Sequence, residues 1–135
     1  MEVAALGGAP GLLSARWATG RDGGPLDGPG LSAALLRRLD GVPAPERHAR
    51  MVCAVALVLP DGRAASGWGE VRGGIAFDQR GAGGFGYDAV FLLPDGRRLS
   101  EVPLGVKDRL GHRGQAVRAV VPALRRWLRG GGAPG

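Results

Sequence analysis

Cysteine is almost missing from this chain of 135 residues, whose only thiol is Cys53. A single cysteine cannot form a disulfide within the chain, so the small secreted domains that depend on several disulfides are excluded. Cys53 lies inside an apolar run, where a free cysteine usually behaves as a small hydrophobic side chain. The cysteine content therefore favours a protein of a reducing compartment.

Long hydrophobic runs are also missing. The longest apolar run, residues 51–60, is much shorter than the roughly 20 residues that a membrane-spanning helix needs. Residues 1–11 contain no basic region followed by an apolar stretch, which a secretory signal would have. We expect a cytoplasmic protein that has no membrane partner.

Acidic residues are outnumbered, and lysine is almost absent. The chain has 12 acidic and 18 basic residues, so its net charge is +6. Only one basic residue, Lys107, is a lysine. Such a charge attracts polyanions, such as nucleic acid or nucleoside phosphates, or it simply forms a solvated surface. The basic residues are spread along the chain, and no helix-turn-helix or aromatic–basic strand pattern is visible. The solvated surface is the simpler interpretation, and we expect no nucleic-acid partner.

Apolar residues are plentiful, at 44% of the chain, which is enough for the core of one domain. Their spacing and two Pro-Asp-Gly turn signals predict the elements. Helices or helical turns are predicted at 12–17, 31–39 (with Ser32 near its start), 103–110 and 112–129, and strands at 50–59, 63–77 and 89–93. Four glycines within 63–77 indicate bulges or close backbone approach, and Pro122 predicts a kink or two helices end to end. We expect one domain over residues 1–129 and a disordered tail at 130–135.

Three short segments are candidates for chemistry, and the first consists of Gly84, Phe85, Gly86, Tyr87 and Asp88. Glycines beside an aromatic residue let the backbone turn sharply and present a ring to a flat ligand such as a nucleobase. The only tyrosine of the chain lies here, next to a carboxylate. Taken alone, the same pattern also fits a glycine-rich turn whose two aromatic rings belong to the core.

The other two segments are Lys107 and the pair His112-Arg113. An ammonium group and a guanidinium group are not interchangeable at a tight site, so a single lysine among many arginines is notable. His112 and Arg113 open the last predicted helix, where backbone N–H groups and positive potential suit a carbonyl oxygen or a phosphate. The alternatives are a chance occurrence for Lys107 and a capping or packing role for His112.

Taken together, the three segments resemble a known family. The GFGYD segment, a lysine 19 residues after its aspartate and His-Arg five residues later are similar to the C-terminal signature of the inosine triphosphate pyrophosphatases. These are the non-canonical purine NTP pyrophosphatases, also called dITP/XTP pyrophosphatases. The resemblance covers nearly the whole chain, including residues 5–11, 50–62 and 80–81. It implies an α/β fold with a long twisted mixed sheet flanked by helices, and a homodimer.

The resemblance also implies a reaction and a binding site. The family hydrolyses ITP, dITP and XTP to the monophosphate and pyrophosphate with Mg²⁺, which clears deaminated purines from the nucleotide pool. The implied substrate-binding residues are Phe85, Gly86, Tyr87, Asp88, Lys107, His112 and Arg113. Phe85 is expected against the base, and Lys107, His112 and Arg113 at its carbonyl edge. The 6-oxo group of hypoxanthine and xanthine accepts hydrogen bonds, whereas the amino group of adenine would face only donors.

Several family motifs have no counterpart in this sequence. They are a Thr-x-Asn-x-x-Lys loop for the triphosphate, a metal-binding Glu, and an Asp-Asp-Ser-Gly segment with the catalytic Asp. Residues 1–3 correspond to the stretch directly after that segment, so we expect the first third of the family's length, with its catalytic Asp, to lie upstream of Met1. The carboxylates that could substitute show no convincing metal-ligand spacing: Glu2, Glu70, Asp78, Asp88 and Glu101. We expect no catalytic and no metal-binding residue in this chain, and Glu101 is expected to be structural.

Two functions therefore stay open. The first is hydrolysis of non-canonical purine nucleoside triphosphates. The second is a non-catalytic nucleotide-binding or dimerisation remnant of the same family.

Overall fold

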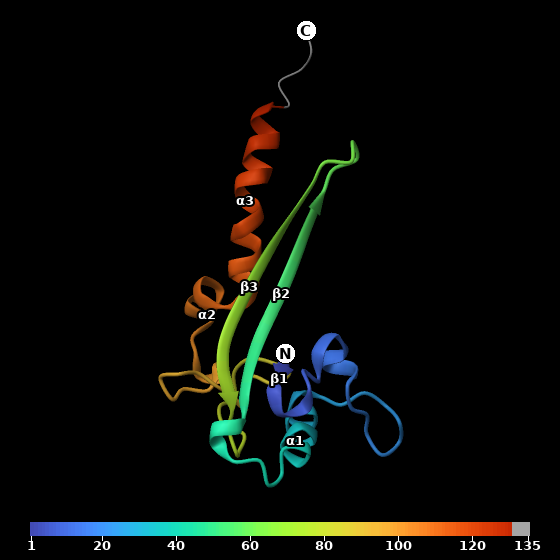
Figure 1. Cartoon of the computed structure of the whole chain (residues 1–135), viewed down its shortest axis with the longest axis vertical. Helices are drawn as coiled ribbons and strands as arrows, with labels where there is room; N and C mark the ends of the chain where they lie inside the picture. Colours follow the sequence, from blue (N-terminus) through green and yellow to red (C-terminus); the bar gives the residue numbers. More distant parts are fainter. Residues whose placement is uncertain (131–135) are drawn as a thin grey trace. The chain divides into compact units, whose positions relative to one another are not determined.

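The computed structural model of the chain describes residues 1–130, which divide into two compact units (Figure 1). We call residues 1–51 and 72–104 the first unit, and residues 52–71 together with those from 105 onward the second unit. The predicted tail begins at residue 130, which is the last residue of a helix, and residues 131–135 lie outside the described part. The single domain expected over residues 1–129 stays a prediction.

Four strands form one sheet in the order β1-β2-β3-β4. The strands are β1 (Glu2–Val3), β2 (His48–Val58), β3 (Ala64–Ile75) and β4 (Phe91–Leu92). Val3 lies opposite Ala49 and Ile75 opposite Phe91, and both pairings are antiparallel, whereas a mixed sheet was expected. The turn after β2 is closed by the hydrogen bond from Leu59 N to Arg63 O, at 2.9 Å. With the helices described next, the sheet confirms the expected α/β fold.

Three α-helices and four short 3₁₀ segments complete residues 1–130. They are η1 (Ala4–Leu6), η2 (Gly11–Arg16), α1 (Gly28–Arg38), η3 (Ala44–Glu46), η4 (Leu99–Glu101), α2 (Leu104–Leu110) and α3 (His112–Gly130). The first helix starts three residues earlier than predicted, because the Asp27 side chain accepts a hydrogen bond from Gly30 N at 2.8 Å and caps it. Ser32, which the sequence placed near the helix start, lies inside α1 and is completely buried.

The core of the first unit is formed by the apolar stripe of α1 and by residues around β1 and β4. Val3, Leu35, Leu39, Val90 and Phe91 are each 0% exposed. Burying a side chain of this kind contributes about 1.5–3 kcal/mol to the free energy of unfolding. The helical spacing of the leucines at positions 31, 35, 36 and 39 predicted the buried face, and three of them are buried, whereas Leu36 is half-buried.

In the second unit, α3 lies alongside the hairpin of β2 and β3 (Figure 1). A Cβ added to Gly67 or Gly69 would lie inside 3.0 Å of the backbone of α3 at Ala116 and His112. Of the two alternatives that the sequence left open, bulges and close backbone approach, Gly67 and Gly69 show close backbone approach. The strand β3 runs through them without a break. Pro122 lies inside α3, which continues as one helix rather than two, because its buried face persists on both sides of the proline.

Membrane crossing was not expected from the sequence. Among residues 1–130, none of the helices combines the length and the apolar character that a bilayer span requires.

Candidate functional site

The first candidate segment forms a loop of the first unit, whose shape depends on its glycines. Gly84 and Gly86 have positive φ angles of 78° and 61°, which glycine adopts without strain. The Asp88 carboxylate accepts a hydrogen bond from Phe85 N at 3.1 Å and thereby closes a tight turn. A side chain at Gly84 would overlap that carboxylate, so this position requires glycine for space as well as for conformation. Asp88 is 6% exposed, and this hydrogen bond makes it part of the loop's framework.

The two aromatic residues of this loop have opposite environments. Tyr87 is 4% exposed, and its hydroxyl donates a hydrogen bond to Ser14 O at 2.8 Å. Burial raises the pKa of Tyr87 to about 12, so the phenol stays protonated and remains a donor at physiological pH. Phe85, in contrast, is 62% exposed. The sequence left open whether both rings belong to the core; one does, and the other is presented to solvent.

The second and third candidate segments, Lys107 and the pair His112-Arg113, lie at the junction of α2 and α3 in the second unit. Lys107 is in α2 and half-buried, while His112 and Arg113 form the first turn of α3, with His112 half-buried and Arg113 exposed. Gly111 N donates to Lys107 O at 2.7 Å, and a side chain at Gly111 would overlap that carbonyl. The Arg118 guanidinium donates to Asp108 O at 3.1 Å, which adds a second link between the two helices. The structure thus places Lys107, His112 and Arg113 at the junction of two linked helices.

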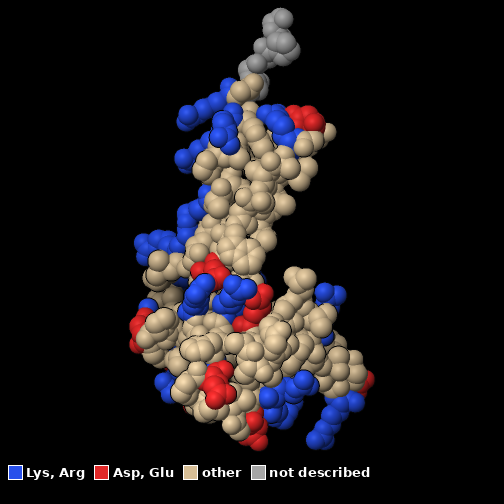
Figure 2. Space-filling view, in the orientation of Figure 1, with Lys and Arg blue, Asp and Glu red and all other residues tan. Residues whose placement is uncertain are grey.

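The second unit also carries most of the chain's net positive charge, because it has 8 basic and 3 acidic residues whereas the first unit has 10 and 9. The helix α3 contains five arginines and no acidic residue. Figure 2 shows the corresponding blue side chains along the part of the molecule where Figure 1 places α3. Such a potential attracts anionic ligands, nucleotides among them.

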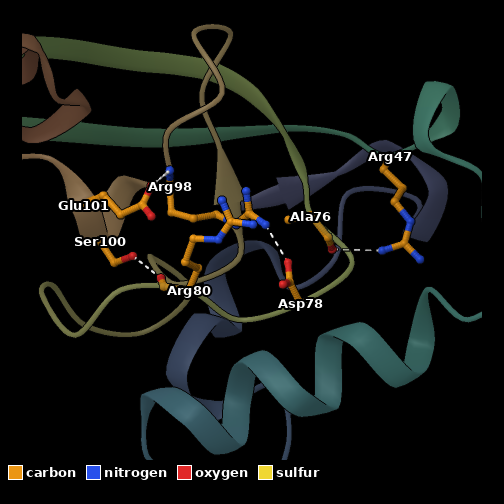
Figure 3. Close-up of polar contacts among 7 residues, drawn as sticks. All are labelled: Arg47, Ala76, Asp78, Arg80, Arg98, Ser100 and Glu101. Carbon is orange, nitrogen blue, oxygen red and sulfur yellow. Dashed lines mark hydrogen bonds and ion pairs between the residues drawn. The ribbon is translucent and has the colours of Figure 1, made fainter.

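The sequence did not single out two buried arginines of the first unit (Figure 3). Arg47 is 4% exposed, and its guanidinium donates to the carbonyl oxygens of Leu39, Val42 and Ala76 at 2.8, 2.8 and 3.1 Å. It also lies 3.9 Å from the centre of the Phe77 ring. Burial lowers the pKa of Arg47, which the nearby Asp40 charge partly opposes. Two of its acceptors lie in the turn five and eight residues before it, and the third, Ala76, lies 29 residues after it, so the full set could not be found from local pattern.

Arg98 is the second buried arginine, at 5% exposed. Its guanidinium lies 2.6 Å from the carboxylate of Asp78, and its backbone N–H donates to the Glu101 carboxylate at 2.7 Å (Figure 3). Among the described residues, Arg98 Nε has no hydrogen-bond partner. Glu101 closes the first turn of η4, which fits the structural role expected for it.

The carboxylates do not assemble into a metal site within residues 1–130. No group of three or more His, Cys, Asp and Glu side chains in this part of the chain could hold a metal ion. Glu2 pairs with Arg50 at 2.6 Å, Asp78 with Arg98, and Asp88 with the backbone of Phe85. The residues present do not fit Mg²⁺.

A depression of about 410 Å³ in the first unit is lined by Glu2, Ala4, Gly8, His48, Ala49, Arg50, Arg72 and Gly73. None of the predicted substrate-binding residues is among them. The predicted residues form two groups, one in each unit, and their convergence on one nucleotide stays a prediction.

Comparison with known proteins identifies relatives of the chain. Residues 1–123 match the model of the Ham1 family. The chain is 48% identical over 126 residues to the dITP/XTP pyrophosphatase of Mycolicibacterium paratuberculosis, covering 92% of this chain and 59% of that protein. It is 43% identical over 122 residues to the dITP/XTP pyrophosphatase of Symbiobacterium thermophilum, with 90% and 59% covered.

Solved structures agree with these matches. The HAM1 protein of Coxiella burnetii superposes with a TM-score of 0.80 at 31% identity, covering 93% of this chain and 63% of that one. The Ham1 protein of Staphylococcus aureus gives a TM-score of 0.77 at 32% identity, with 96% and 62% covered. The chain therefore spans about three-fifths of the length of the relatives that it matches. The resemblance seen in the GFGYD, lysine and His-Arg segments is confirmed: this chain belongs to the Ham1 family.

Proposed function

We propose that this chain supplies the base-recognition part of a pyrophosphatase that hydrolyses ITP, dITP and XTP to the monophosphate and pyrophosphate. The names of its relatives, dITP/XTP pyrophosphatases, support this substrate class. The reaction would clear deaminated purines from the nucleotide pool.

The observation that carries the proposal is the exposed ring of Phe85 on a fixed backbone. An exposed aromatic side chain costs solvation free energy, and a mobile one would lose entropy on stacking. Here the backbone of Phe85 is held by Asp88, and the next aromatic residue, Tyr87, is anchored by its hydroxyl. A base that stacks on Phe85 therefore meets a ring whose position needs little ordering.

Lys107, His112 and Arg113 supply the complementary donors in the proposal. Lysine and arginine side chains have only donors, so they pair with the 6-oxo group of hypoxanthine or xanthine. The 6-amino group of adenine would leave donors on both sides unpaired, at a cost of about 1–3 kcal/mol for each buried group. We propose that this difference selects deaminated purines.

Titration calorimetry with IMP and AMP tests the proposal on the chain as it stands. We expect IMP to bind at least about fivefold more tightly than AMP. Phe85→Ala should weaken IMP binding by about fivefold to a hundredfold, which is the range of one base–aromatic stack. Phe77→Ala is the matched control, since Phe77 is also 62% exposed but stacks on Arg47. Equal affinity for IMP and AMP, or equal effects of the two substitutions, would refute the assignment.

The second candidate is a nucleotide-binding or dimerisation remnant without catalysis. The lack of a metal-ligand cluster within residues 1–130 favours it for this chain. Incubation with dITP and Mg²⁺, followed by measurement of released pyrophosphate, separates the two. Turnover supports the pyrophosphatase, whereas IMP binding without turnover supports the remnant.

The family resemblance further leads us to propose Mg²⁺ as the metal of the reaction, a homodimer, and a cytoplasmic location beside the nucleotide pool. Light scattering tests the dimer, for which we expect twice the 13.8 kDa mass of one chain.

A further inference from the structure

The serines of this chain are divided between two environments. There are four of them, and Ser32 and Ser100 are buried, at 0% and 7% exposed, whereas Ser14 and Ser66 are exposed. Each buried hydroxyl donates its hydrogen bond to a backbone carbonyl of residues 80–86. Both buried serines thus act on the segment that contains Phe85.

Ser100 connects the two ends of this segment. Its hydroxyl donates to Arg80 O at 2.5 Å (Figure 3). Its backbone N–H donates to Asp88 O at 3.0 Å. A Cβ added to Gly83 would lie 2.6 Å from Ser100 O, so the loop backbone passes directly against this residue. A second bond, from Arg80 N to Ala89 O at 2.9 Å, closes the base of the loop. The ends of residues 81–87 are therefore fixed relative to each other.

Ser32 holds the middle of the same loop. From inside α1 its hydroxyl donates to Gly86 O at 3.2 Å, across 54 residues of sequence. The first turn of α1 also lies against Gly86, since a Cβ at Gly28 would be 3.1 Å from Gly86 N. The residue after Phe85 is thus attached to a helix, and the residues on either side of the loop are attached to η4.

We propose that Ser32 and Ser100 are positioning residues that hold Phe85 in the conformation that stacks on the purine base. This inference rests on the proposed function, which assigns the base to Phe85. Neither serine contacts the ligand in this scheme. Each acts through the loop. A loop that samples several conformations binds the base with an affinity that is reduced to the fraction of time it spends in the binding-competent conformation.

Serine suits both positions for a physical reason. A buried carbonyl that loses its donor keeps its desolvation cost, so the loop gains by moving that carbonyl to water. Such a movement of Gly86 O or Arg80 O displaces Phe85 as well. An alanine at either serine therefore loosens the loop without removing an apolar side chain from the core.

The test is a double-mutant cycle with IMP as the probe. Ser32→Ala and Ser100→Ala should each weaken IMP binding by about fivefold, the effect of one ordinary hydrogen bond. In a Phe85→Ala background the same substitutions should change the affinity by less than about twofold, because the ring through which they act is absent. Ser66→Ala, the same change at an exposed strand position of the second unit, should leave the affinity unchanged.

Hydrogen exchange provides a readout that needs no ligand. Backbone amides of residues 84–88 should exchange about fivefold faster in Ser32→Ala and Ser100→Ala, whereas the amides of β2 should keep the rate of the unsubstituted chain. If Ser100→Ala fails to fold, Ser32→Ala alone completes both measurements.

Two outcomes would overturn the inference. One is an undiminished effect of the serine substitutions in the Phe85→Ala background, which would assign them a purely structural role. The other is unchanged exchange in the loop. A failure of the unsubstituted chain to bind IMP, or of Phe85→Ala to weaken it, would instead overturn the proposed function, and faster loop exchange would still show that the serines hold the loop.

Discussion

Gly69 provides the sharpest test of how the second unit is packed. A Cβ at this position would lie well inside 3.0 Å of His112 O and 2.8 Å from Ala116 N, both backbone atoms of α3. No rotation of a side chain can relieve such an overlap, so β3 and α3 would have to separate by about 1 Å or more. Overpacking of this kind typically costs about 1–3 kcal/mol, and backbone contacts belong at the upper end of that range.

We therefore expect Gly69→Ala to lower the free energy of unfolding by about 3 kcal/mol. With a urea dependence of about 1.5 kcal/mol per molar, the unfolding midpoint should fall by about 2 M. Because His112 would move with α3, the proposed IMP affinity should fall as well. Urea unfolding followed by circular dichroism measures the first effect, and calorimetry measures the second.

Gly105→Ala is the matched control for this prediction. Gly105 lies in α2 of the same unit, has no positive φ angle, and a Cβ there would meet nothing within 4 Å. Replacing a helical glycine with alanine usually stabilises by up to about 1 kcal/mol, so the same substitution should act in the opposite direction. A Gly69→Ala protein within about 0.5 kcal/mol of the unsubstituted chain, with an unchanged urea slope, would refute the described packing of β3 against α3.

Further predictions concern the first unit. Arg47→Met should destabilise the chain by about 3 kcal/mol or more in urea unfolding, because three backbone carbonyls lose a charged donor. Arg47→Lys should recover only part of this stability, since an ammonium cannot reproduce the guanidinium fork. Equal stability of Arg47→Met and the unsubstituted chain would contradict the structure. Tyr87 is the only tyrosine, so the ultraviolet absorbance of tyrosinate should report a midpoint near pH 12 in the folded chain and near pH 10 after unfolding. A raised pKa means that the folded state holds the phenol proton more firmly, so this contribution to stability is complete below about pH 10 and is lost between about pH 10 and 12. The Tyr87→Phe protein should not show this loss. A folded midpoint near pH 10 would argue against burial of the ring.

Local chemistry explains the parts of the fold that the sequence predicted. Both Pro-Asp-Gly signals form turns, because the aspartate accepts from the backbone N–H two residues later: Arg63 N to Asp61 at 3.1 Å and Arg97 N to Asp95 at 3.0 Å. These hydrogen bonds and those from the arginine side chains lower the pKa of each aspartate. Neither turn depends on the rest of the chain, so each turn could be predicted from its own four residues.

Two predictions about helices failed, one because a local cap was overlooked and one because packing outweighed a local preference. The expected helix start near Ser32 was wrong, since Asp27 caps α1 and the buried serine donates instead to Gly86. The alternative of two helices end to end at Pro122 was also wrong, because the apolar face of α3 continues past the proline, whereas a kink there stays a prediction. The start of α1 is thus set by a local cap that the sequence analysis did not weigh, whereas at Pro122 the packed face of α3 outweighed the preference of a single residue.

The sequence by itself determined the family, through the spacing of GFGYD, Lys107 and His112-Arg113, and it identified the buried stripe of α1. Periodicity and motif spacing are properties of the chain as written, so they need no coordinates. Only the tertiary structure decided that Phe85 is exposed while Tyr87 is buried, two residues apart. That difference depends on Ser14 O, which lies 73 residues away from Tyr87 along the chain, and on Ser32, 54 residues from Gly86. Contacts over such distances form only when the chain has folded, which is why local pattern cannot predict them.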